Sequence, residues 1–530
     1  MAEYRALRLL RICVLYDLRT DRDWDWKCRK SFVYLLFRRN NREGDRRRLR
    51  ITMNTNIKAS NRRVFLRQAT AVVVSLACNK GIPSWGQIAT ASPKVNAWVT
   101  RGEERFSDLE VEPWSALTSV KAPDVEIDPT RRFQSILGFG GAFTDSSCFL
   151  LSQMETTQRR KLMEELLGSA GLGLSMGRTC IGASDYSRTA YTFDDSPAPD
   201  PELRNFSIAH DIEYILPMLR EAVHVNPELF LFSSPWSPPA WMKTGESLLG
   251  GSMRKHYFAT YAQYFVKFIE AYKAEGVTIG AVTPQNEVDT DQDGQMPAAL
   301  WGQEYETAFI GEFLGPAFRS ASIDTKIWIL DHNYNLCGRV TDELSDPGVF
   351  KYADGVAWHG YVGTPDAMSK VHDAFPTKSA YWTEGGPDIT APNYASDWSK
   401  WSSTFTGILK NRARCIVAWN LVLDEAGGPN IGPFKCGGLV TLDSKTQKIT
   451  RSGQYWAFAH FSKAVHRGAQ VLTTTGTVSG IDHVAFANPD GSYVLVLTNR
   501  GAERDLNCRF QGKSLHLKLA QNSVVTLKWS

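Results

Sequence analysis

The chain has 530 residues, of which 43% are apolar and 11% aromatic, and its formal net charge is +4. Residues 1–52 hold 15 Lys and Arg against 7 Asp and Glu, a surplus of 8, so the remainder carries a net charge of −4. That slightly acidic remainder argues against a nucleic-acid partner, and nine cysteines without a close CxxC spacing predict neither a disulfide framework nor a zinc site. The length suits one large domain and a smaller one.

The N-terminal region reads as sequence outside the mature protein, with an upstream misread of the start codon before Met53, which opens an export signal. Residues 1–52 are Arg-rich without clean periodicity, and we expect this extension to lie outside the mature protein. Residues 53–91 fit an export signal: Asn61–Arg67 resembles the twin-arginine motif, Ala69–Ala77 is mildly apolar, and Ala89–Ala91 fits an A-x-A cleavage site. The apolar stretch is too short to span a bilayer, so we expect export to the periplasm or cell exterior without stable membrane insertion. The alternatives are a basic arm that binds nucleic acid or membrane, and a lipoprotein anchored on the cysteine after the apolar stretch.

Strand-like and helical patterns alternate through residues 133–445. Eight short apolar runs are separated by amphipathic stretches, of which Tyr257–Glu275 is the clearest. Eight strand–helix units in about 300 residues predict a (β/α)8 TIM barrel, with its chemistry at the carboxyl ends of the strands. The predicted strands are Ile136–Phe139, Leu172–Arg178, Leu229–Ser233, Ile279–Val282, Lys326–Leu330, Gly355–Trp358, Ser379–Thr383 and Cys415–Trp419.

The flanking segments predict a second, smaller domain. Residues 446–530 change to alternating strands, and Asn488–Gly491 between two of them ends in the Asp-Gly pair typical of a hairpin turn. Residues 92–132 also read as short strands and turns. We therefore expect a side β-sandwich built from the N-terminal strands and the C-terminal segment.

Two glutamates follow the predicted strands 4 and 7 of the barrel. Pro284 cannot continue a central strand, so the chain turns outward and presents Asn286 and Glu287, while Glu384 comes directly after its strand. Two carboxyls across one barrel mouth can hydrolyse a glycosidic bond, because one protonates the leaving oxygen and the other completes the reaction. A nearby carboxylate makes ionisation costlier, so we expect a raised pKa for Glu287. Taken singly, each glutamate could be a solvated residue at a strand end.

Two other motifs in the chain are weaker. Gly173–Gly177 fits the G-x-S-x-G elbow of esterases, but that elbow needs a helix directly after its serine, and a strand-like run follows here. Asp289, Asp291 and Asp293 have the spacing of a calcium loop, but Leu300 stands where an EF-hand has its glutamate. A different calcium site and a solvated acidic turn both stay open for this loop, and we expect no metal or other cofactor in the reaction.

Five blocks carry the most specific signal: Gly138–Asp145, Arg178–Asp185, Ser234–Thr244, Asn286-Glu287, and Trp419–Leu421 with Gly427–Asn430. In order and spacing, from about residue 133 to the C-terminus, they resemble glycoside hydrolase family 30, and most closely the branch that contains lysosomal glucocerebrosidase. The resemblance implies a barrel with a side β-sandwich and hydrolysis with retention of the β-configuration. It also implies that Glu287 is the acid/base and Glu384 the nucleophile.

The resemblance assigns further roles residue by residue. Tyr361 matches a tyrosine that hydrogen-bonds the nucleophile, and His359 supports the site from the same block. Arg178 matches a buried arginine that keeps the nucleophile ionised, although a purely architectural role is the alternative. Substrate contacts are implied for Asp185, Trp236, Trp419 and Asn430 in the first sugar subsite, and for Asn286 at the 2-hydroxyl.

Departures from the family pattern bear on the leaving group rather than on the chemistry. Val288 stands where the branch usually has proline, Gly385-Gly386 follows Glu384, and Gly360 stands where the lysosomal enzyme has an aromatic residue. We therefore expect a retaining β-glycosidase that hydrolyses β-glucosides, glucosylceramide first among them, so that its partner is a carbohydrate or glycolipid substrate. The alternatives are an endo-β-1,6-glucanase or β-xylosidase of the same family and, from a different class, a non-catalytic carbohydrate-binding barrel.

Overall fold

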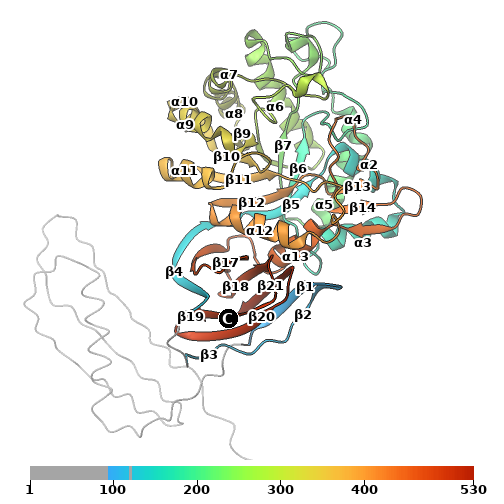
Figure 1. The fold of residues 1–530 in the computed structure, drawn as a ribbon. Coiled ribbons are helices and arrows are strands. Elements are labelled where there is room, and N and C mark those ends of the chain that lie inside the picture. Colours follow the sequence, from blue (N-terminus) through green and yellow to red (C-terminus); the bar gives the residue numbers. More distant parts are fainter. Residues whose placement is uncertain (1–93, 118–121) are drawn as a thin grey trace, which may run out of the picture. The chain divides into compact units, whose positions relative to one another are not determined.

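The computed structural model describes residues 94–117 and 122–530; the predicted basic extension and export signal lie outside them. Eight parallel strands close a barrel in the order β10-β11-β12-β5-β6-β7-β8-β9 (Figure 1). Each predicted strand overlaps one of these eight, which confirms the predicted TIM barrel. Their bounds are β5 Gly138–Ala142, β6 Met176–Cys180, β7 Phe230–Ser234, β8 Ile279–Val282, β9 Lys326–Asn333, β10 Ala353–His359, β11 Ser379–Glu384 and β12 Ala413–Ala418.

Amphipathic helices alternate with the strands along the chain. In α6, Tyr261, Tyr264, Phe265 and Phe268 are fully buried at helical spacing, so one face of the helix packs into the core. The helix ends before Gly276, whose φ of +81° suits the position after a helix end. The helices are α2 Asp145–Gln153, α3 Thr156–Leu167, α4 Ala209–Glu213, α5 Ile215–Val225, α6 Phe258–Ala274, α7 Gln303–Ala308, α8 Gly315–Ser320, α9 Cys337–Ser345, α10 Pro347–Tyr352, α11 Asp366–Ala374, α12 Trp398–Lys410 and α13 Gly453–Ser462.

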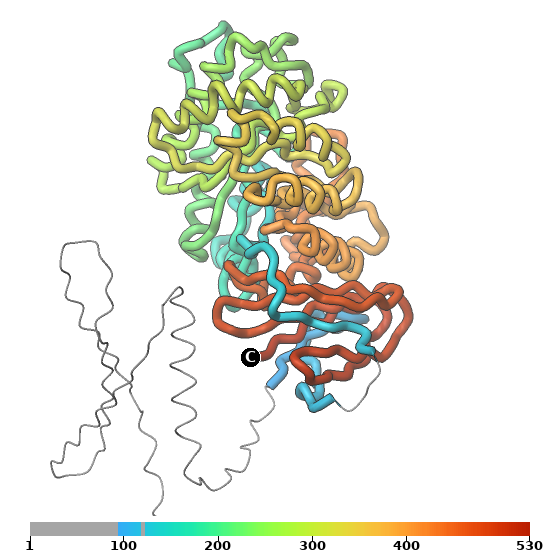
Figure 2. Tube along the Cα trace, turned by 90° about the vertical axis from the view of Figure 1, so that its left-hand side faces the viewer, coloured from blue at the N-terminus to red at the C-terminus, as the bar shows by residue number. Residues whose placement is uncertain are grey.

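A ten-stranded sheet forms the side domain, in the order β2-β1-β21-β18-β17-β16-β4-β19-β20-β3. Strand β1 pairs with the C-terminal β21, and β4 pairs with β16 and β19, so the expected joining of the strands before the barrel with the C-terminal segment is confirmed (Figures 1 and 2). The predicted turn at Asp490-Gly491 joins β17 to β18. The strands are β1 Asn96–Arg101, β2 Glu104–Asp108, β3 Ser115–Ala116, β4 Val125–Ser135, β16 Gln470–Thr475, β17 Ile481–Ala487, β18 Tyr493–Asn499, β19 Arg504–Phe510, β20 Lys513–Leu519 and β21 Ser523–Trp529.

Two elements link the barrel to the sheet. A small sheet of β13 (Val422–Asp424), β14 (Val440–Leu442) and β15 (Ile449–Arg451) follows β12 and leads into α13. The neighbouring helix α12 bonds to the side domain, where Trp398 Nε1 donates to the carbonyl of Asn522 at 2.9 Å. A search of the described residues for membrane-spanning helices finds none of sufficient length and hydropathy.

Candidate active site

The predicted site residues lie on or just beyond the carboxyl ends of the barrel strands. Arg178 is part of β6, while His359 and Glu384 are the last residues of β10 and β11. Asn286 and Glu287 follow β8, and the backbone nitrogen of Glu287 donates to the carbonyl of Asp331 at 3.0 Å. Because the carboxyl ends of all eight strands open on one side, these side chains converge at a single mouth.

Glu384 is held by a cation and a phenol. The buried Arg178 guanidinium donates from one terminal nitrogen to Glu384 Oε2, and the Tyr361 hydroxyl donates to Glu384 Oε1 at 3.0 Å. The other terminal nitrogen of Arg178 donates to Asn286 Oδ1 and Asp331 Oδ2, both at 2.8 Å. Two donors, one of them positively charged, therefore fix both oxygens of Glu384 at the mouth.

Asp331 is a central residue that the sequence analysis missed. It is fully buried in β9, and its Oδ2 accepts from Arg178 while its Oδ1 accepts from His359 Nε2 at 3.0 Å. Burial opposes ionisation, but the Arg178 charge and the His359 bond outweigh it and hold the pKa of Asp331 far below the aspartate value. Asp331 therefore stays negatively charged and orients both cationic partners.

A bulge explains why Asp331 was missed. The predicted strand stops at Leu330, whereas β9 continues to Asn333. Leu330 lies opposite Ala357 of β10, and His332 lies opposite the next residue of that strand, so Asp331 is one extra residue in the ladder. Leu330 and Asp331 have φ of +74° and +47°, the left-handed region that non-glycine residues rarely adopt. Only the pairing with β10 specifies such a bulge, and no local pattern signals it.

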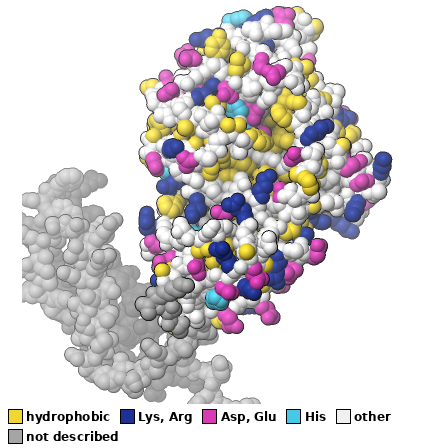
Figure 3. All heavy atoms as spheres, viewed as in Figure 1, with side chains coloured by type: hydrophobic (Ala, Val, Ile, Leu, Met, Phe, Trp, Pro, Cys, Tyr) yellow, Lys and Arg dark blue, Asp and Glu magenta, His cyan; other side chains and the backbone are white. Residues whose placement is uncertain are grey.

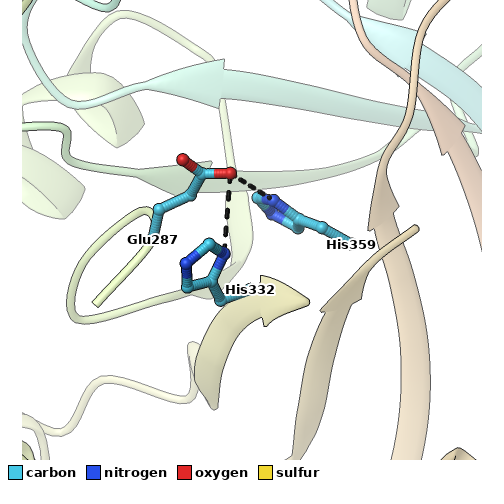
Figure 4. Close-up of side chains that lie close together, drawn as sticks. All are labelled: Glu287, His332 and His359. Atoms are coloured by element: carbon cyan, nitrogen blue, oxygen red, sulfur yellow. Dashed lines mark hydrogen bonds and ion pairs between the residues drawn. The ribbon is translucent and has the colours of Figure 1, made fainter. Parts of the chain in front are cut away.

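Glu287 lies beside two histidines (Figure 4). Its Oε1 is 3.3 Å from His359 Nδ1 and 3.6 Å from His332 Nδ1. Its other oxygen, Oε2, accepts from Gln292 Nε2 at 2.6 Å. Glu287 itself has a φ of +55°, a strained backbone of the kind that clusters at functional sites.

The histidines reverse the expected direction of the Glu287 pKa. Burial alone would raise it, but the hydrogen bond and charge of His359, with the charge of His332, lower it below the glutamate value. Burial would lower the pKa of His359, but Glu384, Asp331 and Glu287 raise it to about 9. The expected increase for Glu287 is therefore wrong, because an imidazolium stands beside it. Glu287 and His359 instead share one proton near neutral pH.

The three aspartates of the acidic loop after Glu287 do not gather into one cluster among the described residues. Asp289 Oδ1 is paired with His332 Nε2 at 2.6 Å, and Asp291 Oδ1 accepts from the backbone nitrogen of Asp293 at 3.3 Å. Among the described residues, the only group of three or more potential ligands within 4.8 Å of one another is Glu287, His332 and His359. The loop therefore positions Gln292 and Asp289 around the acid/base region.

Two stacked tryptophans form one wall of the site. Trp236 and Trp419 have ring centroids 5.1 Å apart and planes 16° apart, and the Arg178 guanidinium carbon lies 4.8 Å from the Trp236 centroid. Asp185 is buried nearby, where burial and the charges of Glu384 and Glu287 raise its pKa well above the aspartate value. These three residues lie together beside Arg178 and the two glutamates, and their contacts with a sugar stay a prediction from the resemblance.

Asn430 bonds within its own loop. Its Nδ2 donates to the carbonyl of Phe434 at 2.6 Å, and its Oδ1 accepts from the backbone nitrogen of Gly432 at 2.5 Å. The backbone of this loop is fixed to the subsite, because the nitrogen of Ile431 donates to the carbonyl of Asp185 at 2.8 Å. In this geometry Asn430 shapes the loop over Asp185 and does not join the Arg178 network.

The Trp382 indole accounts for two of the departures from the family pattern. A Cβ at Gly360 would lie 2.8 Å from Trp382 Cζ2, and one at Gly385 would collide with the same ring. Trp382 is 1% exposed, so the ring has no room to move aside. Glycine at both positions therefore follows from the place of this tryptophan beneath the mouth.

Comparison with known proteins places this site in a family. Residues 136–465 match the glycosyl hydrolase family 30 TIM-barrel domain, and residues 468–527 match the family 30 beta sandwich domain. The Neurospora crassa endo-1,6-beta-D-glucanase is 36% identical over 395 residues, which cover 71% of this chain and 81% of that protein. The mouse lysosomal acid glucosylceramidase is 29% identical over 398 residues, covering 71% and 77%. A solved endo-beta1,6-glucanase has a TM-score of 0.75 and 30% identity, covering 82% and 99%. The chain belongs to glycosyl hydrolase family 30 and is a glycoside hydrolase.

Proposed function

We propose that the protein is a retaining endo-β-1,6-glucanase. The observation that carries the linkage is the 36% identity with the Neurospora crassa endo-1,6-beta-D-glucanase, and the solved endo-beta1,6-glucanase supports it independently. We first expected a glucosylceramidase, with the glucanase as the alternative. The alternative is now the better supported of the two.

The two glutamates divide the proposed reaction between them. In the first step Glu384 bonds to the anomeric carbon, the glycosidic bond breaks with its electron pair on the leaving oxygen, and that oxygen takes a proton from Glu287. In the second step Glu287, now a carboxylate, takes a proton from water, whose oxygen displaces Glu384. The substrate and one water become two sugars with the β-configuration retained.

The neighbouring side chains prepare each glutamate for its step. Arg178 and Tyr361 each donate to one oxygen of Glu384 and so hold its carboxyl group in place for the attack. Arg178 also holds Oδ1 of Asn286, which leaves the Nδ2 group to donate to the 2-hydroxyl. His359 Nδ1 lies 3.3 Å from Glu287 and supplies the shared proton when the leaving oxygen draws one away.

A substrate panel tests the proposal. The protein should cleave linear β-1,6-glucan to oligosaccharides faster than it cleaves β-1,3-glucan, aryl β-xyloside or glucosylceramide in detergent micelles. Proton NMR of the first product should show the β-anomer before mutarotation. A higher kcat/KM on glucosylceramide would overturn the linkage, and an α-anomer formed first would overturn retention.

Glucosylceramide hydrolysis is the second candidate, and exposed apolar side chains on the rim favour it. These residues are 40–52% exposed and lie on loops that follow β7, β8, β10 and β12. Hydrophobic side chains also gather over the barrel part on the face drawn in Figure 3, among scattered charges of both signs. Such a rim suits the lipid tail of a glycolipid. The rim residues are Leu249, Leu300, Tyr361, Val362 and Phe434.

A further inference from the structure

We propose that Glu287, His332 and His359 form a transition-metal site, in which bound Zn²⁺ removes the acid/base from the reaction. Only the inhibition depends on the proposed function, because metal binding requires no substrate. Two imidazole nitrogens and a carboxylate oxygen suit Zn²⁺ and Cu²⁺, whereas Ca²⁺ and Mg²⁺ prefer oxygen ligands alone.

The ligand atoms already have suitable spacing (Figure 4). All three lie within 4.8 Å of one another, and Glu287 Oε1 is 3.3 Å from His359 Nδ1 and 3.6 Å from His332 Nδ1. Tetrahedral zinc with ligands at about 2.0–2.2 Å has ligand–ligand separations of about 3.3 Å. The two separations between Glu287 and the histidines are therefore already close to that value, and the separation between the two histidine nitrogens is at most 4.8 Å.

Carboxylates orient both histidines for this role. His359 Nε2 faces Asp331 Oδ1 at 3.0 Å, and His332 Nε2 faces Asp289 Oδ1 at 2.6 Å. An ionised carboxylate only accepts, so each Nε2 carries a hydrogen and each Nδ1 faces Glu287. A metal binds at Nδ1 through the lone pair, and at His359 it does so by displacing the proton shared with Glu287. Histidines that bind metals typically donate their other N–H to a carboxylate in this way.

His332 provides an independent indication of a ligand. Its side chain is 8% exposed, and its Nδ1 is buried without a hydrogen-bond partner in the described part of the chain. A buried unpaired nitrogen costs free energy, and a metal ion would satisfy it. Four carboxylates lie around the two histidines, while the arginine charges that act on this group come from Arg178 and Arg339, so the local charge also favours a divalent cation once the shared proton has left. The carboxylates are Glu287, Asp289, Asp331 and Glu384.

The test is calorimetric titration of Zn²⁺ into full-length protein that has been stripped with EDTA and dialysed. We expect one site per chain with a micromolar or lower Kd. His332→Gln should weaken it at least 100-fold, and Asp289→Asn about 10–100-fold, because that variant keeps the ligand and loses only its orienting carboxylate. His516→Gln changes a histidine that is 68% exposed on the side domain, and it should bind like the wild type. Thermal melts of each variant report whether it folds.

Two further measurements locate the metal and its effect. Anomalous scattering at the zinc edge should give a peak among Glu287, His332 and His359, and Zn²⁺ should inhibit aryl β-glucoside cleavage at the concentration at which it binds. No saturable binding below about 100 μM, wild-type binding by folded His332→Gln, or a peak elsewhere would each overturn the site. Binding at this site by protein that does not cleave β-1,6-glucan would refute the proposed substrate and leave the metal site standing.

Discussion

Replacing Asp331 with asparagine would remove the carboxylate that joins the two halves of the site. Its two oxygens accept five hydrogen bonds at 2.6–3.0 Å, from Arg178, Ser234, Thr283, His359 and Thr383. Asparagine keeps one accepting oxygen but places an NH2 group against donors, so some of these bonds must be lost. The Arg178 cation would also lose one of its two buried counter-charges.

The expected loss of stability follows from that geometry. Removing one partner of a buried ion pair costs about 3–5 kcal/mol, and we take about 3 kcal/mol because Glu384 still pairs with Arg178. Unfolding entropy of about 2.1 cal/mol/K per residue, over roughly 430 described residues, converts this to a decrease of about 3 °C in Tm.

The stability difference between wild type and Asp331→Asn should depend on pH, and the pKa of Asp331 sets the direction of that dependence. The pKa of Asp331 is lower in the folded protein than in the unfolded chain, where it is near 3.8. The stabilisation by the carboxylate is therefore complete above that value and is lost as the pH falls below it. By differential scanning calorimetry, the wild type should exceed Asp331→Asn in Tm by the full amount at pH 7. Near pH 3 the difference should shrink by about 1 °C, because about 1.4 kcal/mol is lost for each pH unit below the unfolded pKa and the folded pKa lies still lower.

Asp505→Asn serves as the control, because that side chain is 64% exposed on the side domain. Its Tm should stay within about 1 °C of the wild type at both pH values, as is usual for surface substitutions. Equal melting of Asp331→Asn and wild type at pH 7, or a difference that does not shrink in acid, would refute the role assigned to Asp331.

Three further predictions concern the reaction and the rim. Glu287→Ala should lower kcat/KM about 10²–10⁴-fold on substrates with poor leaving groups, and azide should restore its turnover of an activated aryl glucoside. Glu384→Gln should stay inactive under both conditions. The opposite pattern would exchange the roles of the two glutamates. With EDTA present, kcat/KM should fall on the alkaline side with an apparent pKa near 9, because Glu287 and His359 share a proton until His359 loses it. A decrease in kcat/KM near pH 5 would contradict the shared proton. Lys243→Met should raise KM for long glucans severalfold and leave KM for aryl glucosides unchanged. The reason is that Lys243 Nζ donates hydrogen bonds to Ser237, Leu248 and Ala298 at the rim. An equal change in KM for both substrates would count against a role in the rim.

A spacing prediction accompanies these. A retaining mechanism requires the Glu287 and Glu384 carboxyl groups to lie about 5–5.5 Å apart, against roughly 6.5–9.5 Å for inversion. A crystal structure with a glucosyl group trapped on Glu384 would measure the separation and identify the nucleophile together.

The sequence by itself determined the architecture and the placement of the two glutamates. Strand runs, helical periodicity and turn signals are local patterns, so eight repeats of them were enough to predict the barrel. Pro284 ended one strand before Glu287, and the run Ser379–Thr383 ended beside Glu384, which placed both carboxyls at the same mouth. The sequence also predicted that the strands before the barrel join the C-terminal segment in one side domain, and the pairing of β1 with β21 agrees with this.

Only the tertiary structure decided the electrostatics of the site. Asp331 and His332 reach the mouth through a bulge in β9 that exists because of pairing with β10. The pKa of Glu287 is lowered rather than raised because His359, 72 residues away in the chain, lies against it. Bulges depend on pairing between residues distant in sequence, and pKa values depend on the charge and burial that such contacts create. Local sequence patterns therefore predict neither of them.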